Sequence, residues 1–278
     1  MLPLLLAAAL LSASPYRQSP YVGALAMETA TGRILLSDHA ERRCYPASCT
    51  KLMTLYVALE ELSAGRIALT DRVFITPEAL KEQPSVSGLK SGDSLTLDEL
   101  LKALMVKSAN DAAIMIAQHI AGRDVGNFIA MMNQTAKQLG MTNTVYCSPN
   151  GLPPPKGSKR GFDYSTASDL ARLACALLKN HPEALKYTSL ATCTLVSGKG
   201  SRLQYTNHNN LLAKPSMKMP EVDGLKTGYI DAGGCSIVLT GKRNGKRAVV
   251  VVVGSLSGEE RDRVAGRLLS DALGAISW

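Results

Sequence analysis

The chain has 278 residues, of which 46% are hydrophobic and 19% are charged. These proportions allow a soluble protein with a substantial core, built as one large domain or as two closely packed layers. Aromatic residues make up only 5%, and the basic residues behind the formal charge of +8 are scattered along the chain, which argues against binding of nucleic acid. The charge suits an evenly solvated basic surface or attraction to an anionic polymer.

The N-terminal residues MLPLLLAAALLSAS form an apolar stretch that ends in small residues. Such a stretch is typical of a secretory signal peptide and is too short to span a bilayer. We therefore expect a signal peptide over residues 1–16, a mature domain over residues 17–278 and no transmembrane span in the mature chain. No Lys or Arg precedes the stretch, unlike in a usual signal peptide, so a buried N-terminal strand is the alternative.

The first half of the chain predicts strands followed by helices. Residues 21–27 and 33–36 have the pattern of two strands joined by a turn. A helix is expected over residues 48–62, with its apolar residues on one face. Beyond it the pattern stays mostly helical to about residue 190, apart from a long surface loop over residues 148–163 that is rich in Pro and Gly.

The last part of the chain returns to a period of two. Strands are expected at residues 225–229, 234–241 and 247–254. Asn244-Gly245 is a hairpin-turn signal between the last two, and a helix over residues 261–273 follows. Strands at both ends and helices between them indicate an α+β fold, in which one antiparallel sheet built from both chain ends packs with helices and an inserted mostly helical layer.

Neither the cysteines nor the histidines are spaced as a metal site, so we expect no metal and no cofactor. Most of the cysteines are expected to be small buried residues, and the sequence does not choose among disulfide pairings. Cys49 is not expected to be a nucleophile, because no His/Asn constellation accompanies it. The residues of these two types are Cys44, Cys49, Cys147, Cys175, Cys193 and Cys235, and His39, His119, His181 and His208.

Three short motifs follow one another along the chain: Ser48-Cys49-Thr50-Lys51, Ser108-Ala109-Asn110 and Lys226-Thr227-Gly228. The first two patterns are weak alone, because S-x-x-K recurs at Ser87-Gly88-Leu89-Lys90 and S-x-N recurs at Ser148-Pro149-Asn150. K-T-G occurs at one place only. Order, spacing and local context favour the first set of three.

Ser48 and Lys51 are three residues apart, which places them on one face of the expected helix. A serine hydroxyl needs a base within hydrogen-bond reach, and an amine buried among apolar residues has a lowered pKa that lets it act as that base. The alternative is a surface Ser and Lys on an amphipathic helix.

The other two motifs have a chemical and a structural interpretation each. Ser108 and Asn110 are suited to relay a proton and to hold a substrate carbonyl, or else they cap a buried helix. Lys226 and Thr227 offer a cation and a hydroxyl to a carboxylate, on a strand edge that Gly228 leaves open to an extended substrate. The alternative for Lys226 is a solvent-facing edge lysine that guards against aggregation.

Longer blocks around these motifs resemble the D-alanyl-D-alanine carboxypeptidase family of low-molecular-mass penicillin-binding proteins. The resemblance extends from about Tyr21 to Leu273 and implies a β-lactamase/transpeptidase-like fold. Many relatives continue into a second β-rich domain and a membrane anchor, and neither is expected in this chain. The similar blocks are residues 46–54, 107–112, 150–152, 164–171 and 222–228.

The resemblance implies a serine hydrolase that trims peptidoglycan stem peptides ending in D-Ala-D-Ala and is inhibited by β-lactams. Such an enzyme acts in the periplasm or the extracytoplasmic cell wall. The resemblance makes Ser48 the acylated nucleophile and Lys51 its base, with Ser108 and Asn110 as the second catalytic element.

The resemblance also implies how the substrate is bound. Lys226 and Thr227 would bind the terminal carboxylate, and the main-chain amides of Ser48 and Tyr229 would form the oxyanion hole beside Gly228. Arg261 is in the place where the family usually has an arginine that orients the carboxylate. His208 departs from the family, which commonly has an Arg there.

Other functions use the same residues. The alternatives are a D,D-endopeptidase that cuts peptidoglycan crosslinks, a non-catalytic peptidoglycan-binding protein, and an esterase or amidase for other small acyl substrates.

Class A β-lactamases have the three motifs and, in addition, a loop glutamate that activates the deacylating water. Residues 148–163 contain no Glu, and their only acid is Asp163, so efficient penicillin hydrolysis is not expected.

Overall fold

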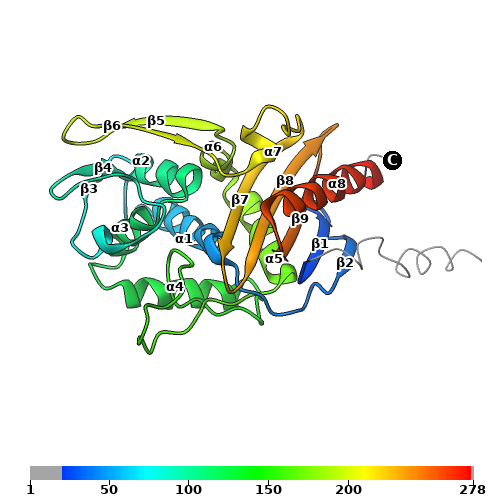
Figure 1. The fold of residues 1–278 in the computed structure, drawn as a ribbon, viewed down its shortest axis with the longest axis horizontal. Coiled ribbons are helices and arrows are strands. Elements are labelled where there is room, and N and C mark those ends of the chain that lie inside the picture. Colours follow the sequence, from blue (N-terminus) through cyan, green and yellow to red (C-terminus); the bar gives the residue numbers. More distant parts are fainter. Residues whose placement is uncertain (1–20, 277–278) are drawn as a thin grey trace, which may run out of the picture.

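The computed structural model describes residues 21–276, and the signal peptide expected over residues 1–16 lies outside the described residues. Both ends of the described chain contribute to one antiparallel sheet, in the strand order β2-β1-β9-β8-β7 (Figure 1). The predicted α+β architecture is therefore confirmed. The strands of this sheet are β1 (Gly23–Glu28), β2 (Ile34–Asp38), β7 (Val222–Ile230), β8 (Gly234–Arg243) and β9 (Lys246–Ser255).

The central strand β9 is buried on both faces, as its uninterrupted apolar pattern predicts. Val249, Val251 and Val253 belong to the large core that the sheet shares with the helices. The residues that alternate with them, such as Val250, belong to a second core under the C-terminal helix α8 (Gly258–Ile276). The turn that joins β8 to β9 has left-handed Asn244 and Gly245, with φ of 51° and 81°, as the predicted type I′ hairpin requires.

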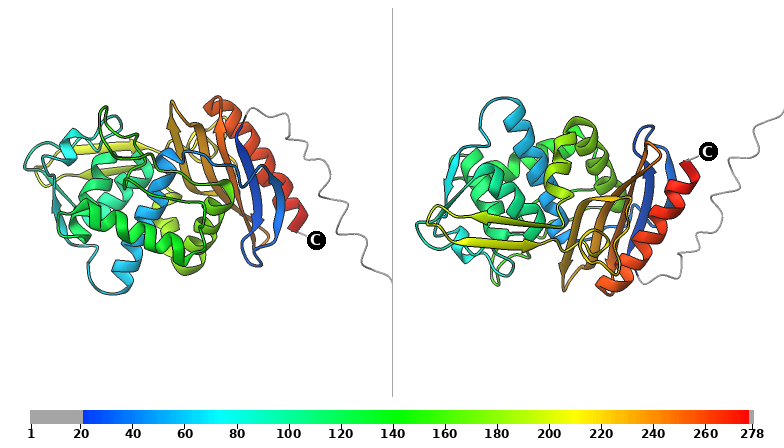
Figure 2. Two further views of the ribbon diagram at one scale, coloured as in Figure 1. Left: turned by 90° about the horizontal axis from the view of Figure 1, so that it is seen from below. Right: turned by 90° about the horizontal axis from the view of Figure 1, so that it is seen from above.

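Most helices between β2 and β7 lie on the other side of the sheet from α8 (Figure 2). The short α7 (Asn210–Ala213) is the exception, because its Leu211 and Leu212 belong to the core under α8. α5 packs against β9 and β1, whereas most of the other helices lie beside the sheet and share the same large core with it (Figure 1). The helices of this part are α1 (Lys51–Ser63), α2 (Leu97–Lys102), α3 (Asn110–Ile120), α4 (Val125–Gln138), α5 (Ala167–Asn180) and α6 (Leu185–Thr188), with the short 3-10 helices η2 (Ala47–Thr50), η3 (Ala79–Lys81) and η5 (Pro182–Ala184).

The helix predicted over residues 48–62 is formed by η2 and α1, and α1 is buried on nearly every side and not on its apolar face alone. Residues 51–59 are all buried, including the side chains of Lys51 and Thr54. The reason is its position, because α1 contacts α3 and α4 as well as α5 and β7. A helix in such a position needs no polar face.

Two small sheets of two strands each interrupt the helical part, and their strands were not predicted. β3 (Arg72–Phe74) pairs with β4 (Ser94–Thr96), and β5 (Thr192–Val196) pairs with β6 (Arg202–Thr206). The strands β3 and β4 have three residues each and are too short for a periodic signal to be recognised.

The six cysteines are free thiols, three of them buried and three half-buried. None of the helices between residues 21 and 276 combines the length and the apolar character needed to cross a membrane.

Candidate active site

Ser48 and Lys51 lie where the chain enters the helical part of the molecule. Ser48 is in η2, and Lys51 is the first residue of α1, with a residue exposure of 0%. The Lys51 Nζ atom is 2.9 Å from the Ser48 Oγ atom, so the two side chains are in contact, as their spacing predicts. The alternative of a surface Ser and Lys on an amphipathic helix is wrong.

The amine of Lys51 has a hydrogen-bond partner for each hydrogen that an ammonium group carries. Besides the Ser48 hydroxyl, Nζ contacts the Asn110 Oδ1 atom at 2.7 Å and the main-chain oxygen of Asn150 at 2.7 Å. Burial lowers the pKa of Lys51 well below the usual lysine value, and the positive charge of Lys226 lowers it further. A neutral amine is therefore accessible beside the serine hydroxyl.

The second motif forms a turn, and only its last residue belongs to a helix. The π-helical segment η4 (Ala103–Lys107) ends at Ser108, whose φ of 60° is left-handed, and α3 begins at Asn110. The capping alternative is wrong, because Ala109 occupies the N-cap position and no side chain caps the helix. The turn buries Ser108 and directs the Asn110 side chain to Lys51 and to the carbonyl of Pro84.

Two glycines allow distant parts of the chain to reach the backbone around Ser48. A Cβ atom at Gly228 would lie 2.7 Å from the Pro46 carbonyl oxygen and 3.1 Å from the Ser48 main-chain nitrogen. A Cβ atom at Gly151, which has a φ of +81°, would overlap the Ala47 carbonyl oxygen. The edge strand β7 and the loop after Asn150 therefore contact η2 only because both carry glycine at these positions.

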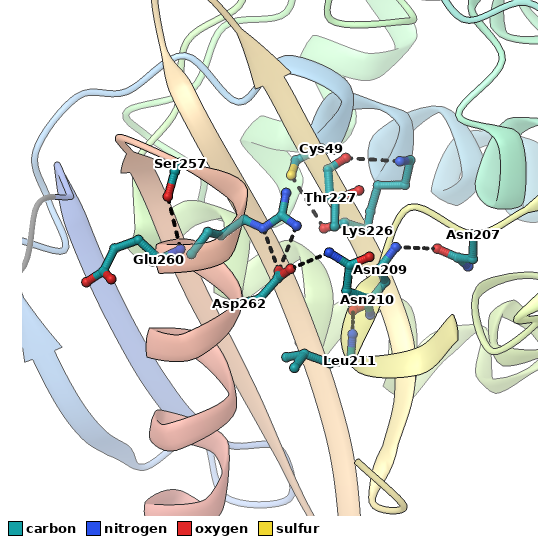
Figure 3. A network of polar contacts seen from close by, with 11 residues as sticks. Cys49, Asn207, Asn209, Asn210, Leu211, Lys226, Thr227, Ser257, Glu260 and Asp262 are labelled. Atoms are coloured by element: carbon teal, nitrogen blue, oxygen red, sulfur yellow. Dashed lines mark hydrogen bonds and ion pairs between the residues drawn. The ribbon is translucent and has the colours of Figure 1, made fainter. Parts of the chain in front are cut away.

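Lys226 and Thr227 are buried on the edge strand, with exposures of 2% and 5%. Lys226 Nζ donates to the Thr227 carbonyl oxygen at 2.9 Å, and the Lys226 carbonyl oxygen lies 3.6 Å from the Cys49 sulfur (Figure 3). Burial lowers the pKa of Lys226 to about 8, and the charge of Arg261 also lowers it. The alternative of a solvent-facing edge lysine is therefore wrong.

The thiol of Cys49 is a packing group in this structure. Its side chain is buried between Ser48 and the β7 backbone, and burial raises the pKa of Cys49 to about 11. A thiol in that state is protonated at neutral pH and is a weak nucleophile. This agrees with the prediction that Cys49 is not the nucleophile.

Arg261 is buried in the first turn of α8, where it pairs with its neighbour Asp262. The Arg261 Nε atom donates to Asp262 Oδ1 at 2.8 Å, and the Asn210 side chain donates to Asp262 Oδ2 at 2.8 Å. Asp262 thereby ties α8 to the short helix α7 (Asn210–Ala213), beside β7 (Figure 3). Arg261 acts on the third motif through its charge, which lowers the pKa of Lys226.

His208 precedes α7 and lies among the cations of this region. Partial burial lowers the pKa of His208 to about 4, and the positive charges of Lys226 and other nearby cations contribute in the same direction. The imidazole is therefore uncharged at neutral pH. The position lacks the permanent positive charge that an arginine would supply.

Three residues around Lys51 make contacts that were not predicted from the sequence. Asn150 belongs to the S-x-N pattern that was set aside as a recurrence, and it is the Asn150 main-chain oxygen that binds Lys51. Asp163 accepts a hydrogen bond from Thr50 Oγ1 at 2.8 Å and so fastens the long loop to η2. Glu82 binds the Asn150 side chain. The similarity of residues 150–152 to the family was a signal for Asn150, whereas no pattern indicated Glu82.

Comparison with known proteins decides the family. The sequence profile described as D-alanyl-D-alanine carboxypeptidase matches residues 17–257. The chain belongs to the D-alanyl-D-alanine carboxypeptidase family. It is 32% identical over 249 residues to D-alanyl-D-alanine carboxypeptidase DacF of Bacillus subtilis, covering 90% of this chain and 61% of that protein. It is 33% identical over 262 residues to D-alanyl-D-alanine carboxypeptidase DacC of Escherichia coli, covering 91% of this chain and 62% of that protein.

The fold of this family member is also that of solved penicillin-binding proteins. The ampicillin-bound form of penicillin-binding protein D2 from Listeria monocytogenes superposes with a TM-score of 0.78 and 28% identity, over 93% of this chain and 99% of that one. The chain spans about three fifths of the length of the curated carboxypeptidases that it matches.

Replacing Gly228 by alanine tests the contact between β7 and η2. The added methyl group has to push the strand away from Pro46 and Ser48, so acylation of Gly228→Ala by a fluorescent penicillin is expected to be about 100-fold slower than that of the native protein. Gly274→Ala is the matched control, because a Cβ atom at Gly274 has no neighbour within 4 Å. Equal labelling rates for a folded Gly228→Ala variant and the native protein would contradict the importance of this contact.

Proposed function

We propose that this protein is a serine-type D-Ala-D-Ala carboxypeptidase, which trims peptidoglycan stem peptides through an acyl-enzyme on Ser48. The observation that carries the proposal is the distance of 2.9 Å between the Ser48 hydroxyl and the buried amine of Lys51. Family membership supports the substrate class, since the matching profile and the curated relatives are all described as D-alanyl-D-alanine carboxypeptidases.

In the acylation step, Ser48 Oγ attacks the carbonyl carbon of the penultimate D-alanine and its proton passes to the neutral amine of Lys51. The peptide C–N bond then breaks, and the terminal D-alanine leaves with a proton on its nitrogen, which Ser108 is suited to relay. Water hydrolyses the resulting ester, which restores the serine hydroxyl and releases the shortened peptide. Asn110 keeps the amine in place during these steps.

The edge strand β7 supplies the groups for substrate binding in this proposal. The Lys226 cation and the Thr227 hydroxyl attract the terminal carboxylate, and the positive charge of Arg261 adds to the field there. The main-chain N–H groups of Ser48 and Tyr229 stabilise the oxyanion. The close approach of Gly228 to the Ser48 nitrogen supports this assignment, because it puts the two N–H groups on neighbouring segments.

The remainder of the stem peptide follows the edge strand β7 as an added strand. A groove with a volume of about 400 Å³ continues from this edge, beyond Tyr229. It is bordered by the segment after η3 and by the loop after Asn150. Its lining includes Lys81, Glu82, Pro84, Leu152, Tyr229 and Ile230.

β-Lactams are proposed as inhibitors that acylate Ser48 and leave slowly. The ampicillin-bound Listeria monocytogenes protein, which shares the fold over nearly the whole chain, supports the first part. Asp163 supports the second part, because its carboxylate accepts hydrogen bonds from Thr50, Ser148 and the Cys147 main chain and therefore has a structural role. The loop acid is thus engaged and does not serve to activate water.

We also propose that the protein is exported, with residues 1–16 as the cleaved signal peptide and residues 17–278 as the mature domain, to the periplasm or the extracytoplasmic cell wall. The apolar N-terminal stretch and the peptidoglycan substrate support this proposal. N-terminal sequencing of the protein recovered from cells tests it. Recovery of the uncleaved chain from the cytoplasmic fraction would contradict it.

The activity itself is tested with a pentapeptide that ends in D-Ala-D-Ala. The native protein is expected to release free D-alanine, and the Ser48→Ala variant is expected to lose at least about 1,000-fold in kcat/KM, because it lacks the nucleophile. A crosslinked peptide dimer, assayed in parallel, distinguishes the endopeptidase alternative. Turnover of the dimer alone favours endopeptidase activity, and turnover of neither substrate favours a non-catalytic binding protein.

The pH dependence of kcat/KM is expected to reflect Lys226 on its alkaline side. Burial places the pKa of Lys226 at about 8, so the cation that attracts the substrate carboxylate is lost as the pH rises through that value. The rate on the pentapeptide should therefore fall above about pH 8. A peptide with a C-terminal amide has no carboxylate to attract, and its slower turnover should lack this decline. Identical alkaline limbs for the two peptides would contradict the role of Lys226.

A further inference from the structure

The Asn150 residue, whose main-chain oxygen binds Lys51, has its own side chain fixed at both polar ends. Its Nδ2 atom donates to Glu82 Oε2 at 2.8 Å, and its Oδ1 atom accepts from the Leu152 main-chain N–H at 3.0 Å. Glu82 follows η3, about seventy residues earlier in the chain, and is half-buried. A continuous series of contacts therefore joins Glu82 to the Lys51 amine through one asparagine.

We propose that Glu82 is a positioning residue for Lys51 and acts through the Asn150 side chain that it binds. This inference rests on the proposed function, in which Lys51 is the base. Glu82 belongs to none of the motifs that identify the family, and its position in the sequence carries no pattern.

The Asn150 carbonyl needs such a restraint because it lies in a loop without regular secondary structure. Isolated bridges and turns are the only regular structure in residues 144–164, so the carbonyl is not fixed by a helix or a sheet. Hydrogen bonds from Thr54 to the Pro149 carbonyl oxygen and from the Gly151 N–H to Ser148 Oγ hold the residues on either side of Asn150. Gly151 allows the loop to approach η2 closely. The hydrogen bond from Asn150 Nδ2 to Glu82 restrains the orientation of the Asn150 residue. Without that bond one of the three contacts of the Lys51 amine loses its support, and the amine gains freedom to move from Ser48.

Glu82 also contributes a negative charge near Lys51. The cation Lys226 on β7 lowers the pKa of Lys51, whereas the carboxylates of Asp163 on the loop and of Glu82 after η3 raise it. Cys49 on η2 is protonated at neutral pH, because burial raises its pKa to about 11. His208, before α7, is uncharged at neutral pH because its pKa is about 4.

Of the two carboxylates, Asp163 is buried, whereas Glu82 lines the substrate groove. Glu82 is therefore a carboxylate that lies in the groove and also acts, through its negative charge, on the proposed base Lys51.

Glu82→Gln separates charge from position, because the glutamine oxygen still accepts from Asn150 Nδ2 while the negative charge is lost. The rate of acylation by a fluorescent penicillin is measured from pH 5 to pH 10. Removal of a charge that favours protonated Lys51 should shift the acid limb to lower pH by about half a unit and leave the plateau within about twofold of the native rate. Glu78→Gln is the matched control, an exposed glutamate in the same segment, and should reproduce the native profile.

Glu82→Ala and Asn150→Ala remove the bond itself and are each expected to lower the plateau about tenfold. The double variant should be no slower than the slower single variant, because both changes break the same contact. Native-like melting temperatures establish that the variants are folded. A Glu82→Gln profile that superposes on the native one would contradict the contribution of the Glu82 charge. Native plateau rates for Glu82→Ala and Asn150→Ala, or additive losses in the double variant, would overturn the positioning role. If no variant and not even the native protein is acylated, the proposed function has failed instead.

Discussion

The arrangement of the molecule around Ser48 depends on the burial of one amine. A charged ammonium group in the protein interior is costly, and an amine in that environment gives up its proton more easily than in water. Lys51 is therefore held where its chemistry differs from that of a surface lysine. Burial on nearly every side of α1 provides the low-dielectric environment, and the cation at Lys226 lowers the pKa of Lys51 further.

Three segments from distant parts of the chain have to meet around Ser48 and Lys51, through one left-handed turn and two glycines. A left-handed turn at Ser108 directs Asn110 to it, Gly151 lets the long loop approach η2, and Gly228 lets the edge strand do the same. The central sheet holds these segments in place. It contains strands from both ends of the described chain, and it fixes β7 beside the start of α1. The fold thereby places β7, the last strand of the sheet, directly next to the serine.

Local features of the structure were predictable from the sequence, and features that depend on distant neighbours were not. Ser48 and Lys51 share a helical turn, and β9 carries its apolar pattern in its own residues, so both could be predicted. The burial of Lys226 depends on the packing of η2 against β7. Asn150 contributes a main-chain oxygen and Glu82 a contact across the fold, and neither leaves a periodic signal. The recurring Ser87 proved to be structural, since it binds Asp111.

Intact mass after incubation with a penicillin tests the central claim most directly, with the Ser48→Ala variant measured in parallel over time. The proposed mechanism predicts one stable adduct of a single penicillin on the native protein and none on the variant. An adduct lost within seconds would indicate a β-lactamase. No adduct on the native protein, or an equal adduct on Ser48→Ala, would contradict the assignment of Ser48 as the nucleophile.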